Sequence, residues 1–199
     1  MARDLIYVTN GCSNHSHQDR AELDYYATNP VDVERLFSEC EGLQLAPNIL
    51  EPCAGEGHIA RVLRDHGHNV ACWDIVQRSY PLDWVGDFLG YRGHWDGDIV
   101  TNPPYDKALE CVQKALSIIP EGRQVVMLLK LTFLEGRKRR ALFDTKQLRT
   151  LYVFSNRTQC SKNGDPLGFD SRMAAVAYGW FVWQKGYTGG DPSIKWISR

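Results

Sequence analysis

Short apolar segments alternate with segments of helical periodicity along most of this 199-residue chain. Four apolar runs have the length of buried strands, and they cover residues 48–51, 70–73, 98–101 and 124–131. Between these runs, apolar residues recur at helical spacing over residues 58–66 and 107–119. This alternation predicts an α/β fold with a mostly parallel sheet and helices on both of its faces. Two later runs, over 150–155 and 173–184, predict an antiparallel C-terminal hairpin at one edge of the sheet.

The length and composition predict one globular domain. Apolar residues make up 43% of the chain and charged residues 24%, as in ordinary globular proteins. We expect a polar N-terminal segment over 1–23, the domain itself over 24–185 and a short C-terminal tail over 186–199. A first helix is predicted to begin at Asn29 and Pro30, because Asn is a good N-cap and Pro suits the first helical position.

The sequence also predicts where the protein resides. No apolar run approaches the roughly 18 residues that a membrane helix needs, and the first residues lack the apolar stretch of a signal peptide. The six cysteines include no Cys-x-x-Cys pair, which favours reduced thiols over a disulfide scaffold or a zinc site. We therefore expect a cytoplasmic protein with no bound metal and no membrane partner.

Positive charge is concentrated in one segment of a chain whose net charge is −1. Residues 130–163 carry nine Lys or Arg residues and only two Asp or Glu residues. Such a run fits a solvated helix face as well as a surface that contacts phosphates. The candidates for nucleic-acid binding in this segment are Arg137, Lys138, Arg139, Arg140, Arg157 and Lys162.

A strand, a glycine-containing turn and a helix follow one another over residues 48–66. Gly55 and Gly57 lack the side chains that would keep a ligand away from the backbone. Asp74 closes the next strand, where a carboxylate can accept hydrogen bonds from both hydroxyls of a ribose, and ligands of open α/β sheets bind at such strand ends. The same pattern fits a turn that needs glycine only for packing. Its Gly55-x-Gly57-x-x-Ala60 spacing also satisfies the dinucleotide fingerprint.

The carboxylate of Glu51 argues against a dinucleotide, because it stands where a pyrophosphate would approach and would repel it. S-adenosylmethionine carries no phosphate, and carboxylates help to hold its cationic sulfonium and ammonium groups. Asp87 and Phe88 follow a further predicted strand, and we expect them to contact the amino group and one face of an adenine ring. The predicted cofactor is therefore S-adenosylmethionine.

The most specific motif of the chain is Asn102-Pro103-Pro104-Tyr105, at the end of a predicted strand. Two consecutive prolines fix the backbone and leave carbonyls without local partners. The Asn102 side-chain oxygen and the Pro103 carbonyl are both able to accept hydrogen bonds from one planar amino group, which draws the nitrogen lone pair out of conjugation. Tyr105 adds a ring on which a planar base can stack. A rigid turn with an incidental aromatic residue is the alternative explanation.

With this motif, the chain resembles the S-adenosylmethionine-dependent amino-methyltransferases, and most closely the small adenine-specific DNA methyltransferases of phages and prophages. The resemblance spans about residues 24–185, and the motifs follow in the family's order. It implies a Rossmann-like class I methyltransferase fold and a DNA partner, with RNA as a possible partner, and it implies the host cytoplasm as the location of a phage-encoded enzyme. It also implies that the Tyr-Ala-Thr-Asn-Pro segment over 26–30 touches the carboxylate of the cofactor.

The predicted catalytic residues are Asn102, Pro103, Pro104 and Tyr105. The predicted cofactor-binding residues are Tyr26, Thr28, Glu51, Pro52, Cys53, Ala54, Gly55, Gly57, Asp74, Ile75, Asp87, Phe88 and Asn102. One position departs from the family pattern, because Cys160 stands where an aromatic residue is expected to face a flipped base. Phe154 or Phe169 would then have to take that place.

Together these residues predict direct transfer of the sulfonium methyl group to the exocyclic amino group of adenine in DNA, by a monomer or a homodimer. The protein would orient the two reactants and stabilise the charge that develops on the acceptor nitrogen. An RNA base, a cytosine amino group and a protein glutamine amide are alternative acceptors, since the motif suits other planar nitrogens. A non-catalytic cofactor- or nucleic-acid-binding module and a nicotinamide dehydrogenase are the alternatives outside this chemistry.

Overall fold

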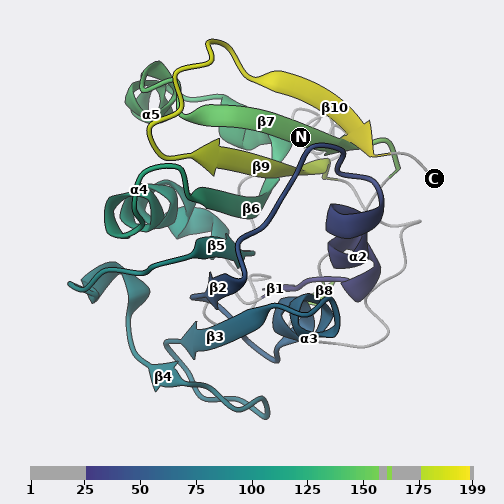
Figure 1. Ribbon diagram of the computed structural model, residues 1–199, viewed down its shortest axis with the longest axis vertical. Coiled ribbons are helices and arrows are strands. Elements are labelled where there is room, and N and C mark those ends of the chain that lie inside the picture. Colours follow the sequence, from purple (N-terminus) through teal and green to yellow (C-terminus); the bar gives the residue numbers. More distant parts are fainter. Residues whose placement is uncertain (1–25, 157–160, 163–175, 198–199) are drawn as a thin grey trace, which may run out of the picture.

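An eight-stranded sheet forms the centre of the computed structural model, which describes residues 26–156, 161–162 and 176–197 (Figure 1). The strand order is β10-β7-β9-β6-β5-β2-β3-β4. The strands are β2 (Asn48–Glu51), β3 (Asn69–Asp74), β4 (Trp84–Val85), β5 (Asp98–Thr101), β6 (Gln124–Lys130), β7 (Leu148–Phe154), β9 (Tyr178–Gln184) and β10 (Ser193–Ile197). The five neighbouring strands β6, β5, β2, β3 and β4 are parallel to one another. Strand β9, by contrast, runs antiparallel to both β6 and β7.

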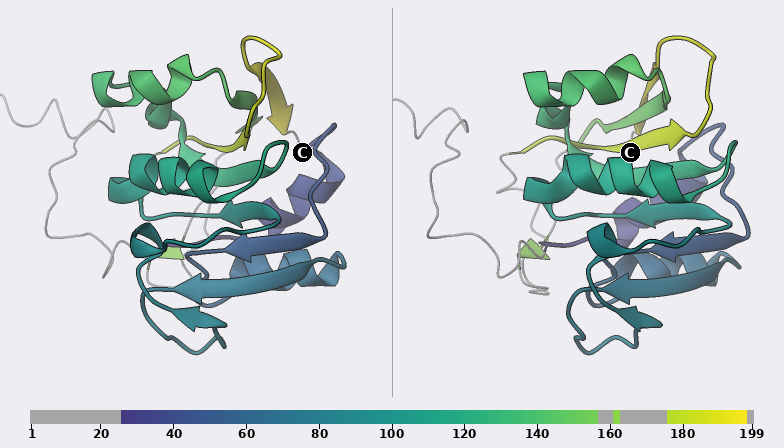
Figure 2. Two further views of the ribbon diagram at one scale, coloured as in Figure 1. Left: turned by 60° about the vertical axis from the view of Figure 1, so that its left-hand side comes forward. Right: turned by 90° about the vertical axis from the view of Figure 1, so that its left-hand side faces the viewer.

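Helices cover both faces of this sheet. One face carries α2 (Pro30–Ser38) and α3 (His58–Asp65), and the other carries α4 (Ala108–Ile118) and α5 (Arg140–Asp144) (Figure 1). The right-hand view of Figure 2 looks onto the face covered by α4 and α5. Successive strand residues face opposite sides, so Ile49 packs in the α2 and α3 core and Leu50 in the α4 core. The predicted α/β fold with a mostly parallel sheet and antiparallel C-terminal strands is therefore confirmed.

Shorter elements connect these layers. The 3-10 turns in the described part of the chain are η2 (Phe88–Gly90), η3 (Tyr105–Lys107), η4 (Leu131–Leu134) and η5 (Arg137–Arg139). A separate two-stranded antiparallel sheet pairs β1 (Tyr26–Ala27) with β8 (Ser161–Lys162). None of the described helices has the length and apolar character needed to cross a membrane.

The predicted start of the first helix is confirmed. The Asn29 side chain accepts a hydrogen bond from the Val31 N–H, with 3.1 Å between Oδ1 and N, and Pro30 occupies the first helical position. The cap satisfies one of the four backbone donors that every helix leaves open at its start. The cap also fixes the backbone just before α2, where Thr28 lies.

Three expected elements differ from the observed ones. The basic run, whose charges fit one solvated helix face, forms from residue 137 a 3-10 turn followed by the short helix α5. Strand β9 begins at Tyr178, while residues 173–175 lie outside the described part of the chain. The expected C-terminal tail contains β10, which extends the sheet in parallel beside β7. Both Ile194 and Trp196 of this edge strand are exposed, so only Ile197 shows the burial that an apolar pattern predicts.

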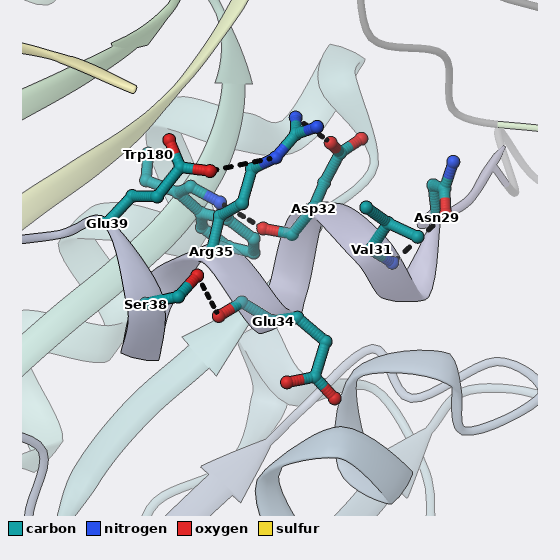
Figure 3. A network of polar contacts seen from close by, with 8 residues as sticks. All are labelled: Asn29, Val31, Asp32, Glu34, Arg35, Ser38, Glu39 and Trp180. Atoms are coloured by element: carbon teal, nitrogen blue, oxygen red, sulfur yellow. Dashed lines mark hydrogen bonds and ion pairs between the residues drawn. The ribbon is translucent and has the colours of Figure 1, made fainter. Parts of the chain in front are cut away.

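A buried ion pair lies within α2, beside the contact of this helix with the sheet (Figure 3). Arg35 Nη1 lies 2.7 Å from Asp32 Oδ1, and both side chains are buried. Arg35 Nε also faces Glu39, at 3.5 Å from its Oε1. On the same helix, the Asp32 carbonyl accepts a hydrogen bond of 3.0 Å from Nε1 of the fully buried Trp180 on β9. The hydrogen bond from Trp180 therefore ties α2 to the sheet, while the charged contacts stay within the helix and its C-terminal end.

Removing Arg35 is expected to lower the free energy of unfolding by more than its own contacts contribute, because the Asp32 carboxylate stays buried beside an apolar core. We expect Arg35→Met to lower the free energy of unfolding by about 3 kcal/mol, measured by urea denaturation. Arg140→Met is the matched control, since it breaks an exposed pair with Asp144 and should cost less than about 1 kcal/mol. Equal losses in the two variants would contradict a structural role for the buried pair.

Candidate active site

A cavity of about 450 Å³ lies at the carboxyl ends of β2, β3 and β5. β2 is hydrogen-bonded to β3 on one side and to β5 on the other, so the loops that leave these strands diverge around a common space. Such points are the usual ligand sites of open α/β sheets. The fold itself therefore creates the cavity in which the predicted motifs meet.

The structure brings most of the predicted site residues to the wall of this cavity. Those that line it are Tyr26, Thr28, Glu51, Pro52, Cys53, Ala54, Asp74, Ile75, Asp87, Phe88, Asn102, Pro103 and Pro104. Gly55, Gly57 and Tyr105 are not among the lining residues. The lining residues that the sequence analysis missed are Ala27, His58, Ile59, Arg78, Leu89, Asp106, Lys107 and Cys111. Six of these eight lie within two positions after a predicted residue, so extending each motif by two positions would have found them, whereas Arg78 and Cys111 carried no such signal.

The carboxylate of Asp74 shapes the glycine turn. Its Oδ2 accepts a hydrogen bond of 2.8 Å from the Gly55 N–H, and its Oδ1 accepts one of 3.0 Å from the Val76 N–H. Arg78 Nη1 lies 3.3 Å from the same Oδ1. Because a carboxylate accepts about four hydrogen bonds, these contacts leave little capacity for the two ribose hydroxyls expected at Asp74. Its first role in this structure is to hold the turn.

Gly57 is needed for a different reason from the one expected. Its φ is +74°, and a Cβ atom at this position would come within 2.5 Å of the Tyr80 ring. Tyr80 is held in turn by Arg61, whose guanidinium lies 4.8 Å from the ring centroid. The close approach that excludes a side chain at Gly57 is therefore that of Tyr80, and not that of a ligand in the cavity.

Glu51 is the most deeply buried acid of the cavity wall. Glu51 is only 1% exposed, and its Oε2 has no hydrogen-bond partner among the described residues. Burial raises the pKa of this carboxyl well above its usual value, and the nearby Asp74 carboxylate raises it further. A hydrogen bond from the Ala60 backbone and the charges of Arg64 and Arg61 counteract this only in part. An unpaired carboxylate oxygen in this position suits a cationic ligand.

The orientation of the Asn102 amide is defined by its two donor contacts. Nδ2 donates to the Tyr26 carbonyl at 2.9 Å and to Thr28 Oγ1 at 3.2 Å. The amide nitrogen thus faces the chain segment before α2, and Oδ1 points away from that segment. Pro103 follows directly and also lines the cavity. Asn102 and Pro103 therefore belong to one wall of the cavity.

Tyr105 lies beside the cavity in a cluster of its own. Its ring centroid is 5.4 Å from that of Tyr26 and 5.9 Å from that of Tyr178. Lys130 Nζ lies 4.6 Å from the Tyr105 ring centroid, within the range of a cation–π contact. The ring that the sequence analysis expected to stack on a base is thus surrounded by protein groups in this structure, and Tyr26 is the member of the cluster that reaches the cavity.

Two further titratable side chains of the wall are held uncharged. A hydrogen bond with Cys111 and burial raise the pKa of the Cys53 thiol well above its usual value. Burial lowers the pKa of the His58 imidazole, only partly countered by the Glu56 carboxylate. A protonated thiol is a poor nucleophile, so Cys53 is unsuited to covalent catalysis.

The basic segment is divided by its contacts. Arg137 and Lys138 are exposed, whereas Arg139 donates to the carbonyls of Thr132 and Glu135. Arg140 pairs with Asp144. Of the other two candidates, Arg157 lies outside the described residues, and Lys162 is described only as a strand residue opposite Tyr26.

The expected aromatic contact to a flipped base is not provided by Phe154. This side chain is buried in the core between the sheet and α2, where the Arg35 guanidinium lies 5.8 Å from its ring centroid. Cys160 and Phe169 lie outside the described residues. Among the residues that the structure describes, no group of three His, Cys, Asp or Glu side chains is placed to hold a metal ion.

The fold can be compared with solved structures, although no protein-family model and no curated protein match the sequence. A putative class I S-adenosylmethionine-dependent methyltransferase from Listeria monocytogenes matches with a TM-score of 0.54 and 10% identity, over 84% of this chain and 62% of that one. The chain has the class I methyltransferase fold. A putative RNA methyltransferase from Pyrococcus horikoshii matches with a TM-score of 0.56 and 12% identity, over 82% of this chain and 87% of that one.

A modification subunit of a putative type I restriction enzyme from Vibrio vulnificus has the same fold, with a TM-score of 0.58 and 14% identity. The alignment covers 87% of this chain and 47% of the Vibrio protein. This chain therefore spans about half of the Vibrio protein and 62% of the Listeria protein. The Rossmann-like class I methyltransferase fold expected from the sequence motifs is thereby confirmed.

Alanine at Gly57 is expected to distort the turn of this methyltransferase fold, because it combines a left-handed backbone with a clash against Tyr80. Gly122→Ala is the matched control, since φ there is +82° but no atom lies within 4 Å of the added Cβ. The control should lose about 1 kcal/mol of unfolding free energy from backbone strain alone. Gly57→Ala should lose clearly more in the same urea titration. Equal losses would show that the Tyr80 contact does not require glycine.

Proposed function

We propose that this protein is an S-adenosylmethionine-dependent methyltransferase that acts on a planar exocyclic amino group, with adenine in DNA as its acceptor. The observation that carries the proposal is the oriented amide of Asn102, which lies in the wall of the same cavity as Glu51 and Asp74. One cavity thus joins a group suited to a cationic cofactor and a group suited to an amino acceptor.

The chemistry of the cavity wall fits the proposed cofactor. Glu51, Asp74 and Asp87 supply three carboxyl groups, and the buried Glu51 Oε2 has no hydrogen-bond partner among the described residues. Ile75 and Phe88 add apolar surface for a purine ring. S-adenosylmethionine supplies, when bound, a methyl group on a positively charged sulfur. Glu51 would hold a cationic group of this molecule, while Phe88 and Ile75 would contact its adenine.

The residues of the motif would orient and polarise the acceptor. Asn102 Oδ1 and the Pro103 carbonyl would accept hydrogen bonds from the two hydrogens of an NH2 group, and this aims the nitrogen lone pair at the methyl group. The same oxygens would stabilise the nitrogen as it gains positive charge. A nucleophilic side chain is unnecessary for direct transfer, which agrees with the protonated state of the Cys53 thiol.

Nucleic acid is the favoured class of acceptor. Exposed Arg137 and Lys138 offer positive charge that could contact phosphates, and the motif resembles that of adenine-specific DNA methyltransferases. RNA is the second candidate, because one structural neighbour is described as a putative RNA methyltransferase.

The proposal is tested by methyl transfer from labelled S-adenosylmethionine to duplex DNA, RNA and protein extract in parallel. We expect the label in DNA. After the DNA is digested to nucleosides, the label should be in N6-methyl-2′-deoxyadenosine. Asn102→Ala should bind the cofactor with unchanged affinity and lose at least about 100-fold in transfer rate, because it removes one acceptor-orienting oxygen. Label only in RNA would support the second candidate, and full activity of Asn102→Ala would contradict the site assignment.

Glu51→Gln is expected to separate stability from cofactor binding. Because burial raises the folded-state pKa of Glu51, its contribution to stability is present below the unfolded pKa and is lost as the pH rises through the folded pKa. Without cofactor, the Gln variant should therefore be more stable than the wild type at neutral pH and above. Its cofactor affinity, measured by titration calorimetry, should fall by roughly tenfold or more. Unchanged affinity would show that Glu51 does not contact the cofactor.

A further inference from the structure

We propose that Thr28 is a positioning residue, whose hydroxyl fixes the orientation of the Asn102 amide together with the Tyr26 carbonyl. This inference rests on the proposed function, since it concerns how the acceptor-binding oxygen is aimed. It assigns to Thr28 a role different from the contact with the cofactor carboxylate that the sequence motifs imply. The two roles predict different consequences for the same substitution.

The geometry carries this role. Thr28 is only 3% exposed, and its Oγ1 lies 3.2 Å from Asn102 Nδ2, while the Tyr26 carbonyl oxygen lies 2.9 Å from the same nitrogen. Two acceptors thus face the two hydrogens of one amide. If the amide turned over, its oxygen would face the Tyr26 carbonyl, which cannot donate a hydrogen bond. Oδ1 is therefore kept on the side where the acceptor amino group is proposed to bind.

The backbone that presents Thr28 is fixed without the help of its side chain. Asn29 caps α2 and Pro30 begins it, so the helix start determines where residue 28 lies. On the other side, Tyr26 and Ala27 pair with Ser161 and Lys162 in the β1–β8 sheet. A substitution that keeps the volume of Thr28 is therefore expected to change the hydroxyl contact and little else.

The same contacts explain why an amide is needed at position 102. An aspartate has no hydrogens to offer to the Tyr26 carbonyl and to Thr28 Oγ1, and its ionised form would place negative charge against the carbonyl oxygen. The asparagine amide supplies an acceptor on one side and two donors on the other. The segment before α2 thus selects the side chain of a residue that follows it by more than 70 positions.

The decisive experiment compares Thr28→Val with Thr28→Ser in the full chain. Valine keeps the shape and removes the acceptor, so we expect kcat to fall about tenfold or more while the dissociation constant of S-adenosylmethionine and the KM for DNA stay unchanged. Serine keeps the hydroxyl and should retain most of the activity. Asn102→Asp should lose at least as much activity as Thr28→Val, because it removes both donated hydrogen bonds.

A second readout needs neither cofactor nor turnover. In an amide-resolved NMR spectrum, the side-chain NH2 resonances of Asn102 should shift and exchange faster with solvent in Thr28→Val than in the wild type and in Thr28→Ser. Unchanged resonances and exchange in Thr28→Val would overturn the inference, as would wild-type kcat in that variant. A Thr28→Val variant with weakened cofactor binding and wild-type kcat would instead identify Thr28 as a cofactor contact.

These readouts also separate the inference from the function on which it rests. If the wild type transferred no methyl group to DNA, RNA or protein, the proposed function would fail. The NMR comparison would still report whether Thr28 orients the Asn102 amide. If transfer occurred and the spectra of the three proteins were identical, the function would stand and the inference would fall.

Discussion

The parallel alignment of β2, β3 and β5 is the constraint on which the site depends. Parallel strands end at the same edge of a sheet, so the glycine turn, Asp74 and Asn102 meet there although they are far apart in the chain. Asp74 adds a direct link between two of these loops, because its carboxylate accepts a hydrogen bond from the Gly55 backbone. The cavity is therefore a consequence of strand order, reinforced by one buried carboxylate.

Much of this arrangement could be predicted from the sequence, because it follows from strand ends and local motifs. Glu51 and Asp74 each close a strand, Asn102 directly follows one, and all three line the cavity. Helix α2 was predictable for a similar reason, since Asn29 and Pro30 define its start locally. Features that depend on periodicity and on residues next to strand ends can thus be predicted from the sequence alone.

The parts that could not be predicted depend on contacts between distant segments. Gly57 fits a ligand-binding turn by sequence, but the group that excludes its side chain is the ring of Tyr80, from a loop without any pattern. Tyr105 has the expected motif position, yet Lys130 and Tyr178 surround its ring. Strand β10 was missed although Ser193 to Trp196 alternates polar and apolar residues, because this short run was assigned to the expected C-terminal tail.

Stability and proposed function conflict at Glu51. Glu51 is buried, and one of its carboxyl oxygens has no hydrogen-bond partner among the described residues. When this carboxyl is ionised it destabilises the fold, and the nearby Asp74 adds repulsion. Such a group is tolerated only where the surrounding core offsets its cost, here the apolar packing of β2 between β3 and β5. A cationic ligand would relieve both the burial cost and the repulsion at once. Ligand binding would then stabilise the same segment that the ionised Glu51 carboxylate destabilises when no ligand is bound.

The segment before α2 gives the site a property that strand order alone does not provide. Strand ends determine which residues meet, but they leave the amide of Asn102 free to present either its oxygen or its nitrogen to the cavity. The Tyr26 carbonyl and the Thr28 hydroxyl remove that freedom from outside the central sheet. Because β1 is itself paired with β8, the orientation of the amide depends on one segment that precedes β2 and on another that follows β7 in the sequence. The fold thus determines where the proposed site lies, and the β1–β8 sheet helps to determine how the Asn102 amide is oriented in it.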